Sequence, residues 1–320
     1  MRACILGCAG PVLARPEAAR LRALDPWGFI LFLRNIETPA QVARLVADLR
    51  AAVGRDAPVL IDQEGGRVQR LTPPRWRAWP PPLDPVPGDR VAAFAARGRA
   101  IAAELAALGI DVNCAPVADI AGPRTHPFLR NRCAGTDAAT VAACARAMAE
   151  GLLAGGVLPV VKHLPGHGRA RADSHADLPR VTVAAEVLHA TDFAPFRALA
   201  DLPLAMTAHV VFDALDPDRP ATLSPAAIAA IRDDIAFDGL LMTDDISMGA
   251  LSGPVGARAA AAVAAGCDVV LHCNADAAEA EAVAEGAGTL SGRAAARAAA
   301  ALARRGRACG VDNAPGPTEP

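Results

Sequence analysis

The sequence predicts an α/β fold, a single-domain (β/α)₈ barrel of the TIM type. Eight short apolar runs recur along the chain, and most of them are separated by longer Ala-rich stretches. Apolar runs of five or six residues without alternation indicate strands that are buried on both faces. Strands that alternate with helices pair in parallel through right-handed crossovers, and eight such strands are enough to close a barrel.

The expected elements follow one another in order through the chain. Strands are expected at residues 3–8, 28–33, 59–63, 111–115, 158–163, 204–208, 239–244 and 268–273, and helices at 39–53, 90–108, 140–154 and 225–235. A doubly wound open sheet is the alternative, but no Gly-rich turn for a dinucleotide follows the first run. We expect the barrel to span residues 1–303. Residues 304–320 carry Gly and Pro without periodicity, and we expect them to form a flexible tail.

The composition argues against several classes of partner. The chain has 32 basic and 34 acidic residues and no basic block, so we expect no nucleic-acid partner. No apolar run approaches the ~20 residues that cross a bilayer, so we expect no membrane association. Only seven residues precede Cys8, too few for a lipoprotein leader, and the eight cysteines form no CxxC pair. These features predict a cytoplasmic protein. No pattern predicts an oligomeric state.

Polar residues stand where several of the expected strands end. They are Asp62, Lys162 with His163, His209, and Asp244 with Asp245. In a closed barrel the carboxyl ends of the strands meet at one mouth, where active sites form. We therefore expect these side chains to converge.

The loop at residues 161–179 is the densest cluster of chemically active side chains. It ends in Asp173-Ser174-His175. A carboxylate two residues before an imidazole can bond one ring nitrogen and leave the other free to exchange a proton. A polar loop whose histidines merely satisfy one another remains an alternative. A metal held by His163, His167 and His175 is another, but their irregular spacing on a Gly-rich loop suits a tetrahedral centre poorly. We expect no metal and no other cofactor.

Two further clusters contain carboxylates. Adjacent acidic residues at a strand end point to opposite sides, so we expect only one of Asp244 and Asp245 to face the mouth. The other can cap the following segment. Asp62 with Arg70 suits a polyhydroxylated ligand, because both side chains make directional hydrogen bonds to hydroxyl groups. A purely structural Asp–Arg pair has the same sequence pattern.

Five motifs in order carry a resemblance to a known family. They are DQEGGRVQRL at 62–71, NCAPVAD at 113–119, KHLPGHG with DSH at 162–175, DPDRPATLS at 216–224 and TDDISM at 243–248. Together they resemble the glycoside hydrolase family 3 β-N-acetylglucosaminidases, in particular the single-domain bacterial type of peptidoglycan recycling. The resemblance covers residues 3–275, and the KH-PGHG…DSH loop is its most specific part.

The resemblance implies a retaining exo-enzyme that removes terminal β-linked GlcNAc. It implies that Asp244 is the nucleophile and that His175, supported by Asp173, is the acid/base. It also implies a substrate of GlcNAc linked to 1,6-anhydro-N-acetylmuramic acid, with or without peptide. The residues implied around the terminal sugar are Asp62, Arg70, Arg132, Lys162 and His163.

This sequence departs from the family pattern at three points. The segment around Arg132 matches only loosely, Leu164 replaces the usual Phe, and Arg169 stands where an acidic or small residue is common. A phosphorylase on the same scaffold is one alternative function, because an imidazole shuttle tolerates incoming phosphate better than a carboxylate does. A non-catalytic barrel that binds sugar or metal is the other.

Overall fold

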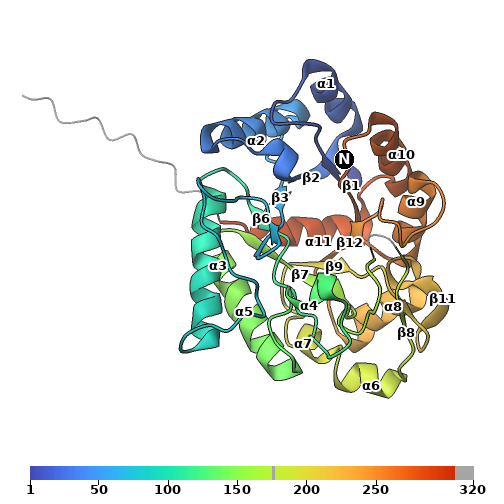
Figure 1. The fold of residues 1–320 in the computed structure, drawn as a ribbon. Coiled ribbons are helices and arrows are strands. Elements are labelled where there is room, and N and C mark those ends of the chain that lie inside the picture. Colours follow the sequence, from blue (N-terminus) through green and yellow to red (C-terminus); the bar gives the residue numbers. More distant parts are fainter. Residues whose placement is uncertain (175–176, 307–320) are drawn as a thin grey trace, which may run out of the picture.

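The chain folds as a closed barrel of eight parallel strands, and the expected fold class is confirmed (Figure 1). The computed structural model describes residues 1–174 and 177–306. Each barrel strand overlaps one of the eight expected apolar runs. Their order around the barrel is β1-β13-β12-β9-β7-β6-β3-β2. The strands are β1 (Arg2–Gly7), β2 (Pro26–Leu31), β3 (Val59–Ile61), β6 (Val112–Asn113), β7 (Leu158–Leu164), β9 (Leu204–Thr207), β12 (Leu240–Asp245) and β13 (Val269–His272).

Helices surround the barrel, and short extra strands lie in the loops at its mouth. The helices are α1 (Arg15–Leu24), α2 (Pro39–Val53), α3 (Arg90–Ala106), α4 (Pro127–Arg130), α5 (Ala138–Ala154), α6 (Ala185–Ala190), α7 (Ala194–Arg197), α8 (Pro225–Ala229), α9 (Val255–Ala265), α10 (Ala277–Ala287) and α11 (Gly292–Ala303). The extra strands are β4 (Gln63–Gly65), β5 (Val68–Gln69), β8 (Arg180–Val181), β10 (Val211–Phe212) and β11 (Asp216–Pro220).

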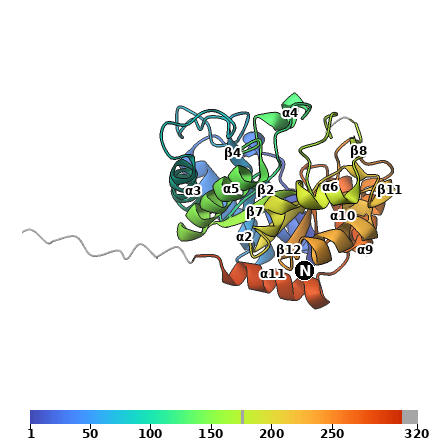
Figure 2. The ribbon, with the colours of Figure 1, turned by 90° about the horizontal axis from the view of Figure 1, so that it is seen from below.

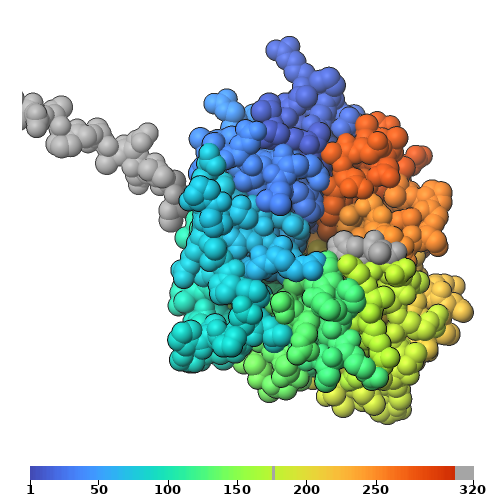
Figure 3. All heavy atoms as spheres, viewed as in Figure 1, coloured from blue at the N-terminus to red at the C-terminus, as the bar shows by residue number. Residues whose placement is uncertain are grey.

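The two ends of the barrel differ. Figure 2 shows α11 across one end and α4 with β4 at the other. The second end receives the carboxyl ends of the strands, and its loops close over most of it around a central recess (Figure 3). Of the expected tail only 304–306 are described; 307–320 lie outside the described residues. None of the described helices is long and apolar enough to cross a membrane.

Local sequence signals explain where the helices begin and end. Thr38 and Gln41 form a capping box at the start of α2, and Gly54 ends that helix with a φ of 65°. This helix has the bounds that the sequence predicts. The helix expected at 225–235 is only partly α-helical, because α8 continues into a π-helical turn at Ala230–Asp234.

Helices α3 and α5 pack closely through two glycines, and this contact supports the mouth. A Cβ on Gly98 would lie 2.3 Å from the carbonyl oxygen of Met148. From α3, the buried Arg97 side chain donates to the carbonyl oxygen of Glu64 at 2.6 Å. The packing of α3 therefore helps to position β4 at the mouth.

We predict that Gly151→Ala in α5 destabilises the protein by about 1–3 kcal/mol, the usual cost of overpacking. The new Cβ would lie 2.5 Å from the Ala95 carbonyl oxygen and 2.8 Å from the Arg99 nitrogen. Urea unfolding measures the change. Gly10→Ala is the matched control, because its Cβ meets nothing within 4 Å. Equal stability of the two variants would contradict close packing of the helices.

Candidate active site

A cavity of about 400 Å³ opens at the mouth of the barrel. Its walls come from strand ends and the loops that follow them, as the sequence predicts. Asp62 follows β3, Lys162 lies on β7, and Asp244 and Asp245 end β12. Four arginines also line the cavity: Arg34, Arg67, Arg70 and Arg132. The described residues thus bring together most of the predicted site.

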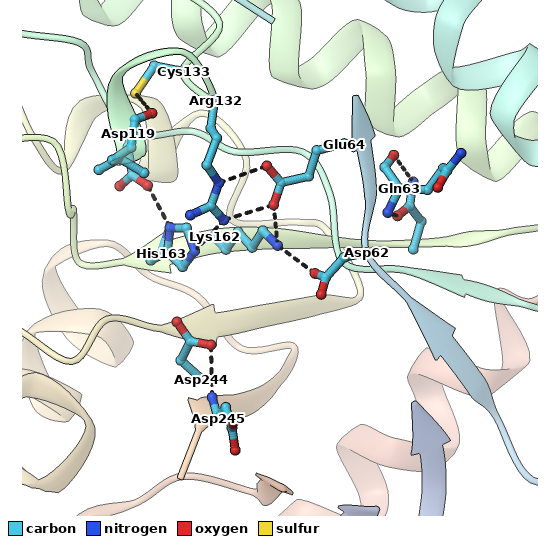
Figure 4. A network of polar contacts seen from close by, with 12 residues as sticks. Asp62, Gln63, Glu64, Asp119, Arg132, Cys133, Lys162, His163, Asp244 and Asp245 are labelled. Atoms are coloured by element: carbon cyan, nitrogen blue, oxygen red, sulfur yellow. Dashed lines mark hydrogen bonds and ion pairs between the residues drawn. The ribbon is translucent and has the colours of Figure 1, made fainter. Parts of the chain in front are cut away.

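A buried cluster of charges surrounds Lys162 (Figure 4). The Lys162 ammonium lies 3.0 Å from Asp62 Oδ1 and 2.6 Å from Glu64 Oε1. Arg70 bonds the second oxygen of Asp62 at 2.9 Å. The Arg132 guanidinium donates two hydrogen bonds to the Glu64 carboxylate, of 2.9 and 2.8 Å. Each carboxylate therefore joins two cations, and the cluster ties β3, β4, β7 and the segment after α4 together.

Burial disfavours the ionised forms of the side chains in this cluster, but their pairing with opposite charges outweighs the effect of burial. Burial alone would raise the pKa of Asp62, yet the charges of Lys162 and Arg70 hold it well below its usual range. Burial likewise works against ionised Glu64, but Arg132 and Lys162 lower its pKa to about 2. Burial alone would lower the pKa of Lys162, but Asp62 and Glu64 raise it. All three groups are ionised at neutral pH.

Glu64 was not among the site residues predicted from the sequence. It lies within the quoted DQEGGRVQRL motif, so the signal was present in the sequence. Its role becomes visible only with Arg132, which is 68 residues away in the chain.

A second chain of hydrogen bonds holds His163. Its Nδ1 lies 2.7 Å from Asp119 Oδ2, and its Nε2 lies 3.3 Å from Arg132 Nη2. The other oxygen of Asp119 accepts the amide of His167 at 2.6 Å. Asp119 ends the NCAPVAD motif, and it too was not among the predicted site residues. This carboxylate fixes the ring of His163 next to the charge cluster.

His167 joins this chain to the following loop. Its Nε2 lies 3.1 Å from Ser174 Oγ, and both side chains are buried. Burial and the neighbouring His163 lower the pKa of His167 to about 4, so its ring is neutral at pH 7. No group of three His, Cys, Asp or Glu among residues 1–174 and 177–306 is placed to hold a metal ion.

Asp244 and Asp245 differ in what their carboxylates do. Asp245 Oδ1 accepts the amides of Ser247 and Cys273, both at 3.1 Å, and Oδ2 accepts the Ser247 hydroxyl at 2.7 Å. Asp244 accepts the Asp245 amide at 2.8 Å. Burial would raise the pKa of Asp244, but His163, His209 and Lys162 together lower it. Asp244 is therefore the carboxylate kept ionised next to the charge cluster (Figure 4).

Two expectations about the mouth need correction. Both Asp244 and Asp245 border the cavity, because the pairing of β12 with β13 shifts register between Met242 and Asp245. The two aspartates differ in their hydrogen bonds.

His163 does not line the cavity and lies behind it, against Arg132. His209 does not line the cavity either. Its ring is buried between the Thr222 hydroxyl, at 2.7 Å, and the carbonyl oxygen of Asp245, at 3.0 Å, so it supports β12 from behind.

The expected Asp173/His175 pair is described only in part. His175 lies outside the described residues. Asp173 is half-buried, and its charge acts on Arg67, a cation that lines the cavity. The backbone of Ser174 accepts the amide of Ala250 at 3.2 Å, which joins this loop to the one after β12.

Comparison with known proteins agrees with the fold and shows the family. The glycosyl hydrolase family 3 N-terminal domain matches residues 16–304. A β-hexosaminidase of Bordetella avium is 37% identical over 279 residues, which are 83% of this chain and 79% of that protein.

Solved structures give the same result. A family 3 β-N-acetylglucosaminidase from Paenibacillus sp. has a TM-score of 0.84 and 32% identity, over 97% of this chain and 63% of that one. NagZ from Neisseria gonorrhoeae, in complex with N-trifluoroacetyl-D-glucosamine, has a TM-score of 0.80 and 29% identity, over 95% of this chain and 98% of that one. The fold and these relatives define a glycosidase. The chain belongs to glycosyl hydrolase family 3.

We predict that Glu64→Gln costs about 3–5 kcal/mol of stability at pH 7, because it leaves Arg132 buried without its partner charge. A carboxyl with a depressed folded pKa stabilises above its unfolded pKa, near 4.3, and loses this effect as the pH falls toward 2. The wild type should therefore lose stability faster than Glu64→Gln below about pH 4.

Urea unfolding between pH 7 and pH 3 measures both effects. Glu281→Gln on the exposed face of α10 is the control, and it should follow the wild type. Identical pH profiles for Glu64→Gln and Glu281→Gln would contradict the role of the cluster.

Proposed function

We propose that the protein is a retaining exo-β-N-acetylglucosaminidase that cleaves terminal β-linked GlcNAc from small peptidoglycan fragments. The observation that carries the proposal is the ionised Asp244 carboxylate facing a pocket whose other walls are rich in hydrogen-bonding charges. A nucleophilic carboxylate next to groups that bind hydroxyls is what a retaining glycosidase requires.

Asp244 acts as the nucleophile in this proposal. One of its carboxylate oxygens attacks the anomeric carbon, and the bond from that carbon to the glycosidic oxygen breaks. The leaving oxygen takes a proton from His175. Water then gives a proton to His175, and its oxygen displaces Asp244 from the anomeric carbon. Two inversions at this carbon restore the β configuration.

His175 and Asp173 supply the proton in this proposal, which rests on the motif that contains them. An imidazole with an unperturbed pKa near 6.5 can both give and take a proton near neutrality. A neutral base also avoids repelling the anionic nucleophile. Asp173 holds the ring and favours its protonated form.

The terminal sugar lies against the charge cluster in this proposal. Asp62, Arg70, Arg132, Lys162 and His163 present carboxylate oxygens, guanidinium groups, an ammonium and an imidazole toward the cavity or directly behind its wall. Such groups form directional hydrogen bonds with vicinal hydroxyls. Their mutual bonds fix them before the sugar arrives, which lowers the entropy cost of binding.

The proposed substrate is a short muropeptide, GlcNAc-1,6-anhydroMurNAc with or without peptide, in cytoplasmic peptidoglycan recycling. The names of the family 3 relatives, β-hexosaminidase and β-N-acetylglucosaminidase, support the sugar. The chain has no Tyr and only 3% aromatic residues, so extensive ring stacking along a polymer is not available. A small cavity at the barrel mouth fits an exo-acting enzyme.

We predict that Asp244→Asn reduces kcat/KM on an aryl β-N-acetylglucosaminide at least ~1,000-fold in phosphate-free buffer. The substitution keeps the shape of the side chain but removes the attacking charge. Asp233→Asn, at an exposed position in the π-helical turn, is the matched control and should retain full activity.

Adding azide to the Asp244→Ala variant, whose smaller side chain leaves room for the anion, shows which role Asp244 has. Azide should restore turnover and yield the α-glycosyl azide, because a single displacement inverts the anomeric centre. A β-azide would instead assign Asp244 to the acid/base role. Wild-type turnover that appears only when phosphate is added, with sugar 1-phosphate as product, would favour a phosphorylase.

We predict a bell-shaped pH profile of kcat/KM whose two limbs respond to different residues. The acidic limb should lie below the range of an ordinary carboxyl, because the pKa of Asp244 is lowered. The basic limb reports protonated His175, which is lost as the pH rises. Asp173→Asn removes the charge that favours the protonated ring, so this limb should move to lower pH by about one unit. A basic limb that does not move would separate Asp173 from the proton shuttle.

A further inference from the structure

A second cavity, of about 600 Å³, lies beside the catalytic one. One loop separates the two: His167 and Ser174 line the catalytic cavity, whereas Arg169 and Arg171 line the second. The remaining walls come from the loop after β6, the start of α5, β8 with the residues after it, and the connection from α6 to α7. The second cavity is therefore not part of the proposed sugar site.

Four arginines line this cavity, and only two of them are neutralised. Arg169 pairs with Asp192 at 2.7 Å, and Arg180 pairs with Asp213. Arg124 and Arg171 are exposed, and neither makes an ion pair or a side-chain hydrogen bond with any residue that the structure describes. These two residues give the cavity a positive charge without a partner.

The acidic residues of the lining are already occupied. Asp192 accepts Arg169 and also the Thr191 hydroxyl, at 2.7 Å. Asp137 caps α5 by accepting the amide of Thr140 at 2.8 Å. Neither carboxylate bonds the guanidinium of Arg124 or Arg171. Asp213, Asp192 and Asp137 together set three carboxylates against the four guanidinium groups, so the cavity keeps an excess of about one positive charge.

We propose that this cavity binds a phosphate group, with Arg124 and Arg171 as its principal ligands. A guanidinium presents two parallel N–H donors whose spacing matches two phosphate oxygens. The two guanidinium groups that form no ion pair offer donors to three or four phosphate oxygens, whereas a monocarboxylate has only two oxygens for them. Thr136 and Thr182 line the same cavity, and a threonine hydroxyl can donate to a further phosphate oxygen.

Bound phosphate would tie two active-site loops together. Arg124 belongs to the loop after β6, and Arg171 belongs to the loop that leads to Asp173. The start of this second loop is already held, because the Thr125 hydroxyl donates to the Gly168 carbonyl at 2.5 Å. Phosphate bound between Arg124 and Arg171 would connect the two loops at a second point, nearer to Asp173.

Isothermal titration with inorganic phosphate at constant ionic strength tests the proposal. The wild type should bind one phosphate saturably, and Arg124→Ala/Arg171→Ala should bind it at least tenfold more weakly. Arg171→Glu, a charge reversal at one exposed position, should also weaken binding. Arg15→Ala/Arg44→Ala, two exposed arginines elsewhere, should bind as the wild type does.

Two competitors locate the site and identify its chemistry. Saturating N-acetylglucosamine should leave phosphate binding unchanged; displacement would place phosphate in the catalytic cavity and overturn the proposal. Succinate should bind more weakly than phosphate, and equal or tighter binding would overturn the phosphate assignment. Unaltered binding in the double variant, or no saturable binding to the wild type, would also overturn it. Glycosidase activity of the double variant in phosphate-free buffer should stay within twofold of wild type.

Discussion

The site depends on the burial of one ammonium group. The side chain of Lys162 is 2% exposed and keeps its charge because Asp62 and Glu64 lie within 3.0 Å of it. Buried ion pairs stabilise a fold little compared with apolar packing. Their effect here is to hold four segments, β3, β4, β7 and the one that carries Arg132, in one arrangement. A set of charges fixed in advance can recognise sugar hydroxyls without reorganising.

The same cluster sets the electrostatics of the nucleophile proposed here. Asp244 is half-buried, and its removal from water would by itself favour the neutral acid, which cannot attack carbon. His163, His209 and Lys162 oppose this effect and lower its pKa. Asp245, one residue further on, uses its carboxylate to hold the amides of Ser247 and Cys273. Lys162 and His163, which are proposed to bind the sugar, therefore also lower the pKa of the proposed nucleophile, Asp244.

The sequence was sufficient for the barrel but only partly for the site. Strands buried on both faces leave a continuous apolar signal, and α2 could be predicted to the residue because its caps are local. Glu64 and Asp119 could not be assigned, because their partners Arg132 and His163 are far away in the chain. The expectation that only one of Asp244 and Asp245 faces the mouth was wrong, because the register of β12 shifts between Met242 and Asp245 and regular alternation ends there.

Trapping the glycosyl–enzyme tests the central claim most directly. A 5-fluoro-N-acetylglucosaminyl fluoride should form the covalent intermediate quickly and release it slowly, so that the adduct survives proteolysis and mass spectrometry. The account predicts one sugar per chain, esterified to Asp244 in the peptide that contains β12. An adduct on Asp245, or full turnover of the reagent without any covalent species, would contradict it.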